Sequence, residues 1–185
     1  MHDLRTFIDS KLTIPIANPT VWNHLILLKI NCFVWRACMD RIPTTAALSR
    51  RGVRTSSLSC SFCINGVDEA NHIIADCPFA LATLSRIMTW CNVPIQSFSS
   101  VTDIVNFAAN WGHCPKRKKI MNAIVYGYTW CVWRARNDSV FNKTRTSPGK
   151  LADHIITVVF SWLKNRGNFG NCIWANWCSQ PFNIL

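Results

Sequence analysis

Apolar residues recur along most of the chain at the three- and four-residue spacing of helices, and little of the sequence alternates as a strand would. One stripe follows Ser100, which with Asp103 resembles a capping box, and it consists of Val101, Ile104, Val105 and Ala108. A longer helix is predicted from Lys116 to about Arg136, with one apolar face made by Ile120, Ala123, Ile124, Gly127, Tyr128 and Cys131. A last helix ends at Gly167, and its apolar face is made by Leu151, Ile155, Val158, Val159, Trp162 and Leu163.

The N-terminal half is also predicted to be helical. The segment from about Thr20 to Asp40 has the length of a helix and is apolar on nearly all sides, which is typical of a helix packed on several faces. Thr44 or Thr45 can cap a short helix that Gly52 ends, and a further helix is predicted over residues 78–90. The fold class is therefore predicted as mostly α, a helical domain with an inserted loop of cysteines and a histidine.

We expect two parts. Residues 1–92, with a core at about 22–90, form the first, and residues 93–185 form a helical C-terminal extension that packs on it. The stretch "NVPIQSFSS" links them.

Charge and cysteine content narrow the function. Among 185 residues, 20 Lys and Arg stand against 9 Asp and Glu, a formal net charge of +11. Such an excess favours an anionic partner, with nucleic acid ahead of an acidic membrane. No signal peptide and no apolar stretch of membrane-spanning length is visible, so the ten cysteines indicate reduced thiols in an intracellular protein, nuclear or cytoplasmic.

The segment "CSFCINGVDEANHIIADC" has the spacing C-x2-C-x8-H-x4-C. Thiolates and imidazole are the ligands of structural zinc, and a closed site takes four of them. The pattern predicts one structural Zn²⁺ held by Cys60, Cys63, His72 and Cys77; the alternative is a set of buried free thiols. We expect Asp68 or Glu69 to begin a short helix with His72 in its last turns and Cys77 just past its end.

Several motifs resemble one known family. They are "KINCFVWRACMDRIPT", similar to a K-x3-F-x-W-R run followed by L/I-P-T; "LSRRGV", similar to L-x-x-R-G; and "DEANHIIADC", similar to E-[TS]-x-x-H-L-[FL]-x-x-C. Together with the C-x2-C pair, they resemble the reverse-transcriptase zinc-binding domain of plant LINE-type retrotransposon polyproteins. The later "WCVWRARNDSVFN" is similar to the family's W-x-x-W-x-x-R-N-x-x-x-F tail.

The resemblance implies zinc ligands at the same four positions. The chain departs from the pattern at Ala70, where Ser or Thr is common, and it has no tryptophan between Cys77 and Trp90. The parent polyprotein is an RNA-directed DNA polymerase, but this chain lacks the Tyr-x-Asp-Asp carboxylates that hold the two metal ions of polymerisation. We therefore predict that it is not an enzyme.

Nucleic-acid binding is the predicted function. The expected phosphate contacts are Arg50, Arg51, Arg54, Lys116, Arg117, Lys118 and Lys119, and a third basic run comprises Arg134, Arg136, Lys143, Arg145 and Lys150. The alternatives are a protein-interaction or folding module that packs on a reverse-transcriptase body, and a retroelement remnant without selected function. No small-molecule substrate and no membrane partner are expected.

Overall fold

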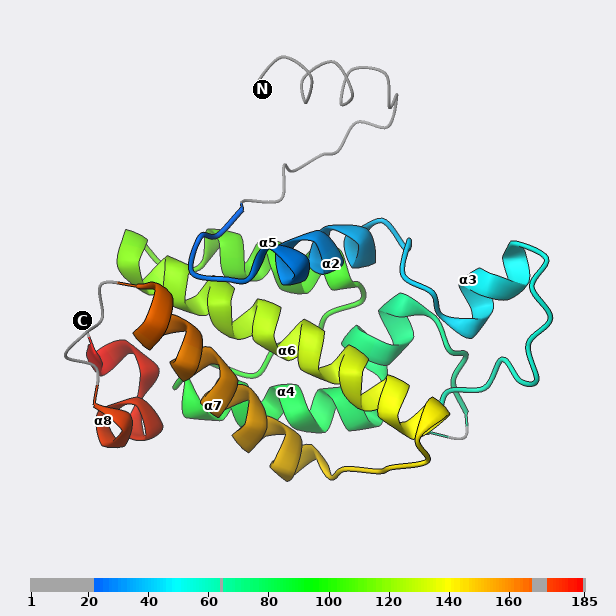
Figure 1. Ribbon diagram of the computed structural model, residues 1–185. Coiled ribbons are helices and arrows are strands. Elements are labelled where there is room, and N and C mark those ends of the chain that lie inside the picture. The colour runs from blue at the N-terminus through cyan, green and yellow to red at the C-terminus, as the bar shows by residue number, and fades with distance from the viewer. Residues whose placement is uncertain (1–21, 64, 168–172, 185) are drawn as a thin grey trace, which may run out of the picture.

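A computed structural model of the chain describes residues 22–63, 65–167 and 173–184 (Figure 1). In chain order the elements are α2 (Leu28–Cys38), α3 (Thr45–Arg50), the π-helical turn η1 (His72–Asp76), α4 (Pro78–Trp90), α5 (Val101–Asn110), α6 (Pro115–Phe141), α7 (Pro148–Arg166), α8 (Trp174–Ser179) and the 3-10 turn η2 (Pro181–Ile184). Apart from one antiparallel bridge between Ser59 and Val67, these described segments have no strand pairing. The predicted mostly α fold is confirmed.

Helix α6 lies at the centre of the molecule, between α2 and α5 on one side and α7 on the other (Figure 1). Every residue from Ile120 to Thr129 is buried, so the prediction of a single apolar face was too narrow. The helix also continues to Phe141, five residues beyond the predicted end. Gly127 lets α7 approach closely, because a Cβ atom there would lie 2.6 Å from Cγ2 of Val159.

The predicted start of the first described helix was wrong. Part of the prediction, at Thr20, lies outside the described residues, and α2 begins only at Leu28. The chain before it turns, because the buried Asn31 side chain donates to the carbonyls of Asn23 and Ile26 at 3.2 and 3.3 Å. Asparagine side chains that bond to nearby backbone favour such turns over helix.

Local capping predictions are confirmed. Thr44 Oγ1 accepts a bond from the N–H of Ala47 at 3.1 Å and begins α3, and Ser100 does the same for α5 through the N–H of Asp103. Helix α7 ends at the predicted Gly167. No helix in the described part of the chain is long and apolar enough to cross a membrane.

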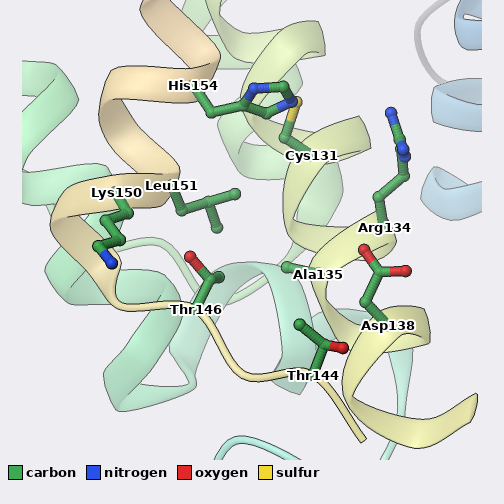
Figure 2. A pocket seen from close by; sticks show the side chains of 9 residues that line it. All are labelled: Cys131, Arg134, Ala135, Asp138, Thr144, Thr146, Lys150, Leu151 and His154. Carbon is green, nitrogen blue, oxygen red and sulfur yellow. The ribbon is translucent and has the colours of Figure 1, made fainter. Parts of the chain in front are cut away.

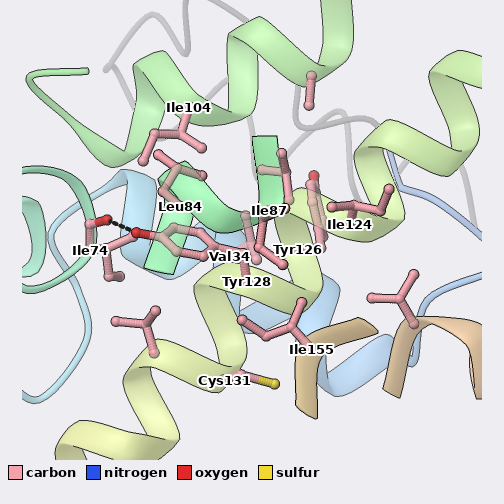
Figure 3. Close-up of a cluster of buried hydrophobic side chains, with 14 of the residues drawn as sticks. Val34, Ile74, Leu84, Ile87, Ile104, Ile124, Tyr126, Tyr128, Cys131 and Ile155 are labelled. Atoms are coloured by element: carbon pink, nitrogen blue, oxygen red, sulfur yellow. Dashed lines mark hydrogen bonds between the residues drawn. The ribbon is translucent and has the colours of Figure 1, made fainter. Parts of the chain in front are cut away.

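The core draws on both halves of the chain. Side chains such as Ile74 and Leu84 pack in the same apolar cluster as Ile124 and Ile155 (Figure 3). The C-terminal tail adds to this core: Trp177 of α8 is fully buried, and Trp90 of α4 donates its indole N–H to the Trp177 carbonyl at 3.1 Å. The division into two parts at residue 92 stays a prediction.

Candidate metal centre and basic surfaces

The four side chains with the predicted zinc-ligand spacing come together in space. The ligand atoms of Cys60, Cys63, His72 and Cys77 all lie within 4.8 Å of one another. The Cys63 Sγ to His72 Nε2 distance is 3.2 Å and the Cys60 Sγ to Cys77 Sγ distance is 3.9 Å. Ligands about 2.0–2.3 Å from a tetrahedral Zn²⁺ lie roughly 3.3–3.8 Å apart, so this arrangement fits a closed zinc site.

A tight hairpin presents the first two ligands. The N–H of Cys60 donates to the Gly66 carbonyl at 2.7 Å, and the N–H of Asp68 donates to the Leu58 carbonyl at 2.8 Å. Inside the hairpin the Phe62 N–H points at Cys60 Sγ, 3.4 Å away. Such N–H groups favour a thiolate at this sulfur.

The π-helical turn η1 presents the other two ligands. The N–H of Cys77 donates to the His72 carbonyl at 2.8 Å, a five-residue step that joins one ligand to the other. The helical residues run from Ala70, directly after Glu69, to Asp76, so His72 lies in a short helix and Cys77 follows just past its end as expected; His72 is in the first turn of that helix and not in the last. The π-helical backbone brings the His72 and Cys77 side chains to the same place. Such turns are frequent at functional sites. Cys77 then precedes Pro78, which begins α4.

The Tyr128 hydroxyl ties η1 to the centre of the fold. It donates to the Ile74 carbonyl at 2.7 Å, as Figure 3 shows, and lies 3.1 Å from the Ala80 carbonyl in the first turn of α4. Tyr128 itself is fully buried in α6. The segment that carries His72 and Cys77 is therefore held by a helix of the C-terminal half.

The His72 ring packs directly on Gly66. A Cβ atom at Gly66 would lie 1.9 Å from His72 Nε2, which no real side chain tolerates. The glycine therefore leaves the space that the coordinating nitrogen occupies.

We expect Gly66→Ala to weaken zinc binding, because the added methyl group must displace the His72 ring. The loss should be roughly 10–100-fold, the range seen when a group that orients a metal ligand is lost. Competition against a chromophoric chelator measures it. Gly149→Ala is the matched control, because its Cβ would lie 3.5 Å from Cζ of Arg86, an ordinary contact. Equal affinities for the two variants would contradict the proposed role of Gly66.

Asp76 orients the histidine ligand. Its Oδ1 lies 2.8 Å from His72 Nδ1, so the ring proton sits on Nδ1 and Nε2 faces the cysteines. A carboxylate that accepts this proton fixes the ring and raises its basicity as a ligand. Sequence reasoning missed Asp76, although its position four residues after His72, one helical turn on, was a usable signal.

The Cys60 and Cys77 thiols lie within hydrogen-bond distance of each other. The hydrogen bond from the Cys77 thiol, helped by backbone N–H groups, lowers the pKa of Cys60 to about 5. The same bond and burial raise the pKa of Cys77 well above its ordinary range. Cys60 is thus a ready thiolate at neutral pH, and zinc must displace a proton from Cys77, so acid opposes binding.

Asp68 joins the hairpin to two helices. Its carboxylate accepts bonds from the N–H and hydroxyl of Thr45 at 2.8 and 2.9 Å, at the first turn of α3. On its other side it forms a buried ion pair with Arg136 of α6, whose Nε lies 2.9 Å from Oδ1. Asp68 therefore caps α3 and not a helix of its own. Arg136 is 2% exposed, so its place in the third basic run was wrong.

The predicted phosphate contacts form two separate groups. Arg50, Arg51 and Arg54 are exposed at the C-terminal end of α3, where Arg50 pairs with Asp40. Lys116–Lys119 lie in the first turn of α6, with Lys118 half-buried and the others exposed. Arg136, near the C-terminal end of α6, contacts Asp68 of the zinc hairpin. About 20 residues of α6, or roughly 30 Å, therefore separate Lys116–Lys119 from the hairpin. Within the described residues the structure brings no second Cys/His cluster together.

Comparison with known proteins agrees with the geometry. No curated protein and no solved structure matches the chain, and no catalytic domain family is detected in it. The family described as zinc-binding in reverse transcriptase matches residues 7–83, a range that contains all four ligands. The prediction of one zinc site is confirmed. Residues 7–83 of this chain therefore match the family of zinc-binding domains of reverse transcriptase.

Proposed function

We propose that the chain is a non-catalytic module of a plant LINE-type retroelement that binds a nucleic-acid strand beside its zinc hairpin. The observation that carries the proposal is the anchoring of α3. Asp68 of the hairpin holds the N-terminal end of this helix, while its C-terminal end presents exposed arginines. Zinc would then fix the direction in which Arg51 and Arg54 point.

The whole-chain charge supports an anionic partner. A net charge of +11 attracts polyanions over distances of about a Debye length, and phosphate contacts supply most of non-specific affinity. Such contacts carry little base information, so we expect broad binding across sequences.

The Lys116–Lys119 group supports the same partner for a different reason. Four cations occupy the first five residues of α6, whose first turn has no acidic residue and no side-chain cap. Cations at a helix N-terminus oppose the helix dipole, at a cost of about 0.3–1 kcal/mol each at low salt. These lysines and the arginine therefore do not stabilise α6 by themselves. A phosphate bound to them would offset their unfavourable interaction with the helix dipole.

The test measures binding of fluorescent single-stranded RNA and DNA by anisotropy over a range of salt concentrations. Each phosphate contact on a single strand contributes roughly 0.7 to the slope of log affinity against log salt. Arg51→Ala/Arg54→Ala should therefore flatten the slope by up to about 1.4 for RNA and DNA alike. This variant keeps the Arg50–Asp40 pair.

The control is Lys29→Ala/Lys164→Ala, which removes the same charge from α2 and α7. These lysines lie over the rings of Trp130 and Phe160. The proposal is wrong if the arginine variant and this control have the same slope as the parent chain.

A second candidate function is docking on a reverse-transcriptase body. Phe141, at the end of the tail motif, is 73% exposed, and Trp174 is 44% exposed. An exposed aromatic side chain can contribute to an apolar contact surface. Self-association that salt does not change, together with no strand binding, would favour this function.

A further inference from the structure

A pocket of about 160 Å³ lies between α6 and α7, on the opposite side of α6 from α2 (Figure 2). Side chains of α6, of the loop after it and of the first turns of α7 line it. The zinc site and the two basic groups described above do not account for it.

The floor of the pocket is apolar and uncharged. Ala135 and Leu151 are buried there, beside Cys131. Burial raises the pKa of Cys131 to about 12, so this thiol is neutral at physiological pH. An apolar floor favours a ligand with a flat or apolar body over a bare anion.

The rim carries two cations on opposite sides. Figure 2 shows the Arg134 and Lys150 side chains extending outward from α6 and α7. Both are exposed, and neither forms an ion pair among the described residues. Asp138, the acid at the rim, is instead bonded to the Asn142 side chain at 3.0 Å. The two cations are therefore available to a ligand.

Hydroxyl groups complete the rim. Thr144 and Thr146 come from the loop that joins α6 to α7. Together with the Asp138 carboxylate they offer acceptors and donors to a polar edge that lies over the apolar floor.

We propose that this pocket holds one nucleoside unit of a single-stranded nucleic acid, with the phosphates before and after it meeting Arg134 and Lys150. The inference rests on the proposed function and names a specific site for it. A nucleoside has an apolar face for Ala135 and Leu151 and polar edges for the rim. Its flanking phosphates suit cations that stand apart, as these do.

The pocket also lies at the correct end of the molecule. Arg134 is two residues, or about 3 Å along the helix axis, from Arg136. Arg136 holds Asp68 of the zinc hairpin, and Asp68 holds α3. The pocket therefore lies at the same end of α6 as Arg51 and Arg54, where a nucleic-acid strand bound to these arginines could reach it. Lys116–Lys119 lie at the other end of α6.

The experiment uses the zinc-loaded chain and a fluorescent single-stranded oligonucleotide. Arg134→Ala/Lys150→Ala should flatten the salt slope by about 1.4, two contacts of roughly 0.7 each. Lys164→Ala is the control, because it removes a lysine from the same helix 14 residues away, about 21 Å along the axis. Its slope should equal that of the parent.

Filling the pocket separates a site from mere surface charge. Ala135→Met on the floor or Thr146→Met on the rim keeps every charge and should weaken binding without changing the slope. Two positions are used because Ala135 is buried, and melting temperature and zinc content verify folding. The inference about the pocket is wrong if the parent binds the strand and the two Met variants and Arg134→Ala/Lys150→Ala all bind as the control does. That outcome leaves the proposed function standing. A parent that binds no strand overturns the proposed function with it.

Discussion

Cys77→Ser is expected to abolish stoichiometric zinc binding and to unfold the segment from Leu58 to Cys77. Structural zinc contributes about 10–16 kcal/mol of apparent binding free energy in small zinc domains, which is comparable with the roughly 5–15 kcal/mol stability of a whole protein. Elemental analysis gives the zinc content, and thermal unfolding with and without a chelator gives the stability. We expect the chelator to lower the melting temperature of the parent and to leave the variant unchanged.

Cys178→Ser is the matched control. Cys178 is exposed in α8 and lies outside the cluster, so its replacement should change neither zinc content nor the response to chelator. The reciprocal test is the double variant Cys60→Ser/Cys63→Ser. If it still binds one zinc per chain, the ligand assignment is wrong.

Loss of zinc should reach beyond the hairpin. Ile73 and Ile74 of η1 are fully buried, and Tyr128 bonds to the Ile74 carbonyl. When the ligands no longer hold η1, the hydroxyl of Tyr128 loses an acceptor inside the core, where an unpaired polar group costs about 1–3 kcal/mol. We therefore expect removal of zinc to lower the helical circular-dichroism signal as well, because α4 and α6 contact η1.

The sequence predicted the parts of the fold that short-range chemistry determines. Caps such as Thr44 and Ser100 act on amides two or three residues away, so their effect is visible in the chain itself. The start of α2 depended on the Asn23–Asn31 bonds, and the burial of α6 on all sides depended on which helices surround it. Both are tertiary effects that a periodic pattern does not contain.

The candidate site divides in the same way. The four ligand residues and their spacing lie within one short segment, so the zinc site was predictable from the sequence. The π-helical geometry was not, because a spacing of five residues fits several backbone paths. The Asp68–Arg136 pair joins residues 68 positions apart, and nothing local distinguishes Arg136 from the exposed Arg134 two residues before it.

Removing one partner of the Asp68–Arg136 pair is expected to lower the stability of the fold strongly. Asp68→Ala leaves the Arg136 guanidinium buried without a counter-ion and removes the acceptor for Thr45 at the start of α3. Breaking a buried ion pair in this way costs about 3–5 kcal/mol. For a chain of this length that corresponds to a fall in melting temperature of roughly 6–20 °C. Asp153→Ala, at an exposed position of α7, is the control and should have little effect.

A double-mutant cycle isolates the pair. Arg136→Met keeps much of the side-chain volume against Trp133, whose ring centroid lies 5.1 Å from the guanidinium carbon. Since Asp68→Ala/Arg136→Met leaves no buried charge, it should be less destabilised than the sum of the two single variants. Additive losses would show that the two residues stabilise the fold independently. In that case α3 would be held by the Thr45 bonds alone, and Arg51 and Arg54 would be positioned without help from α6.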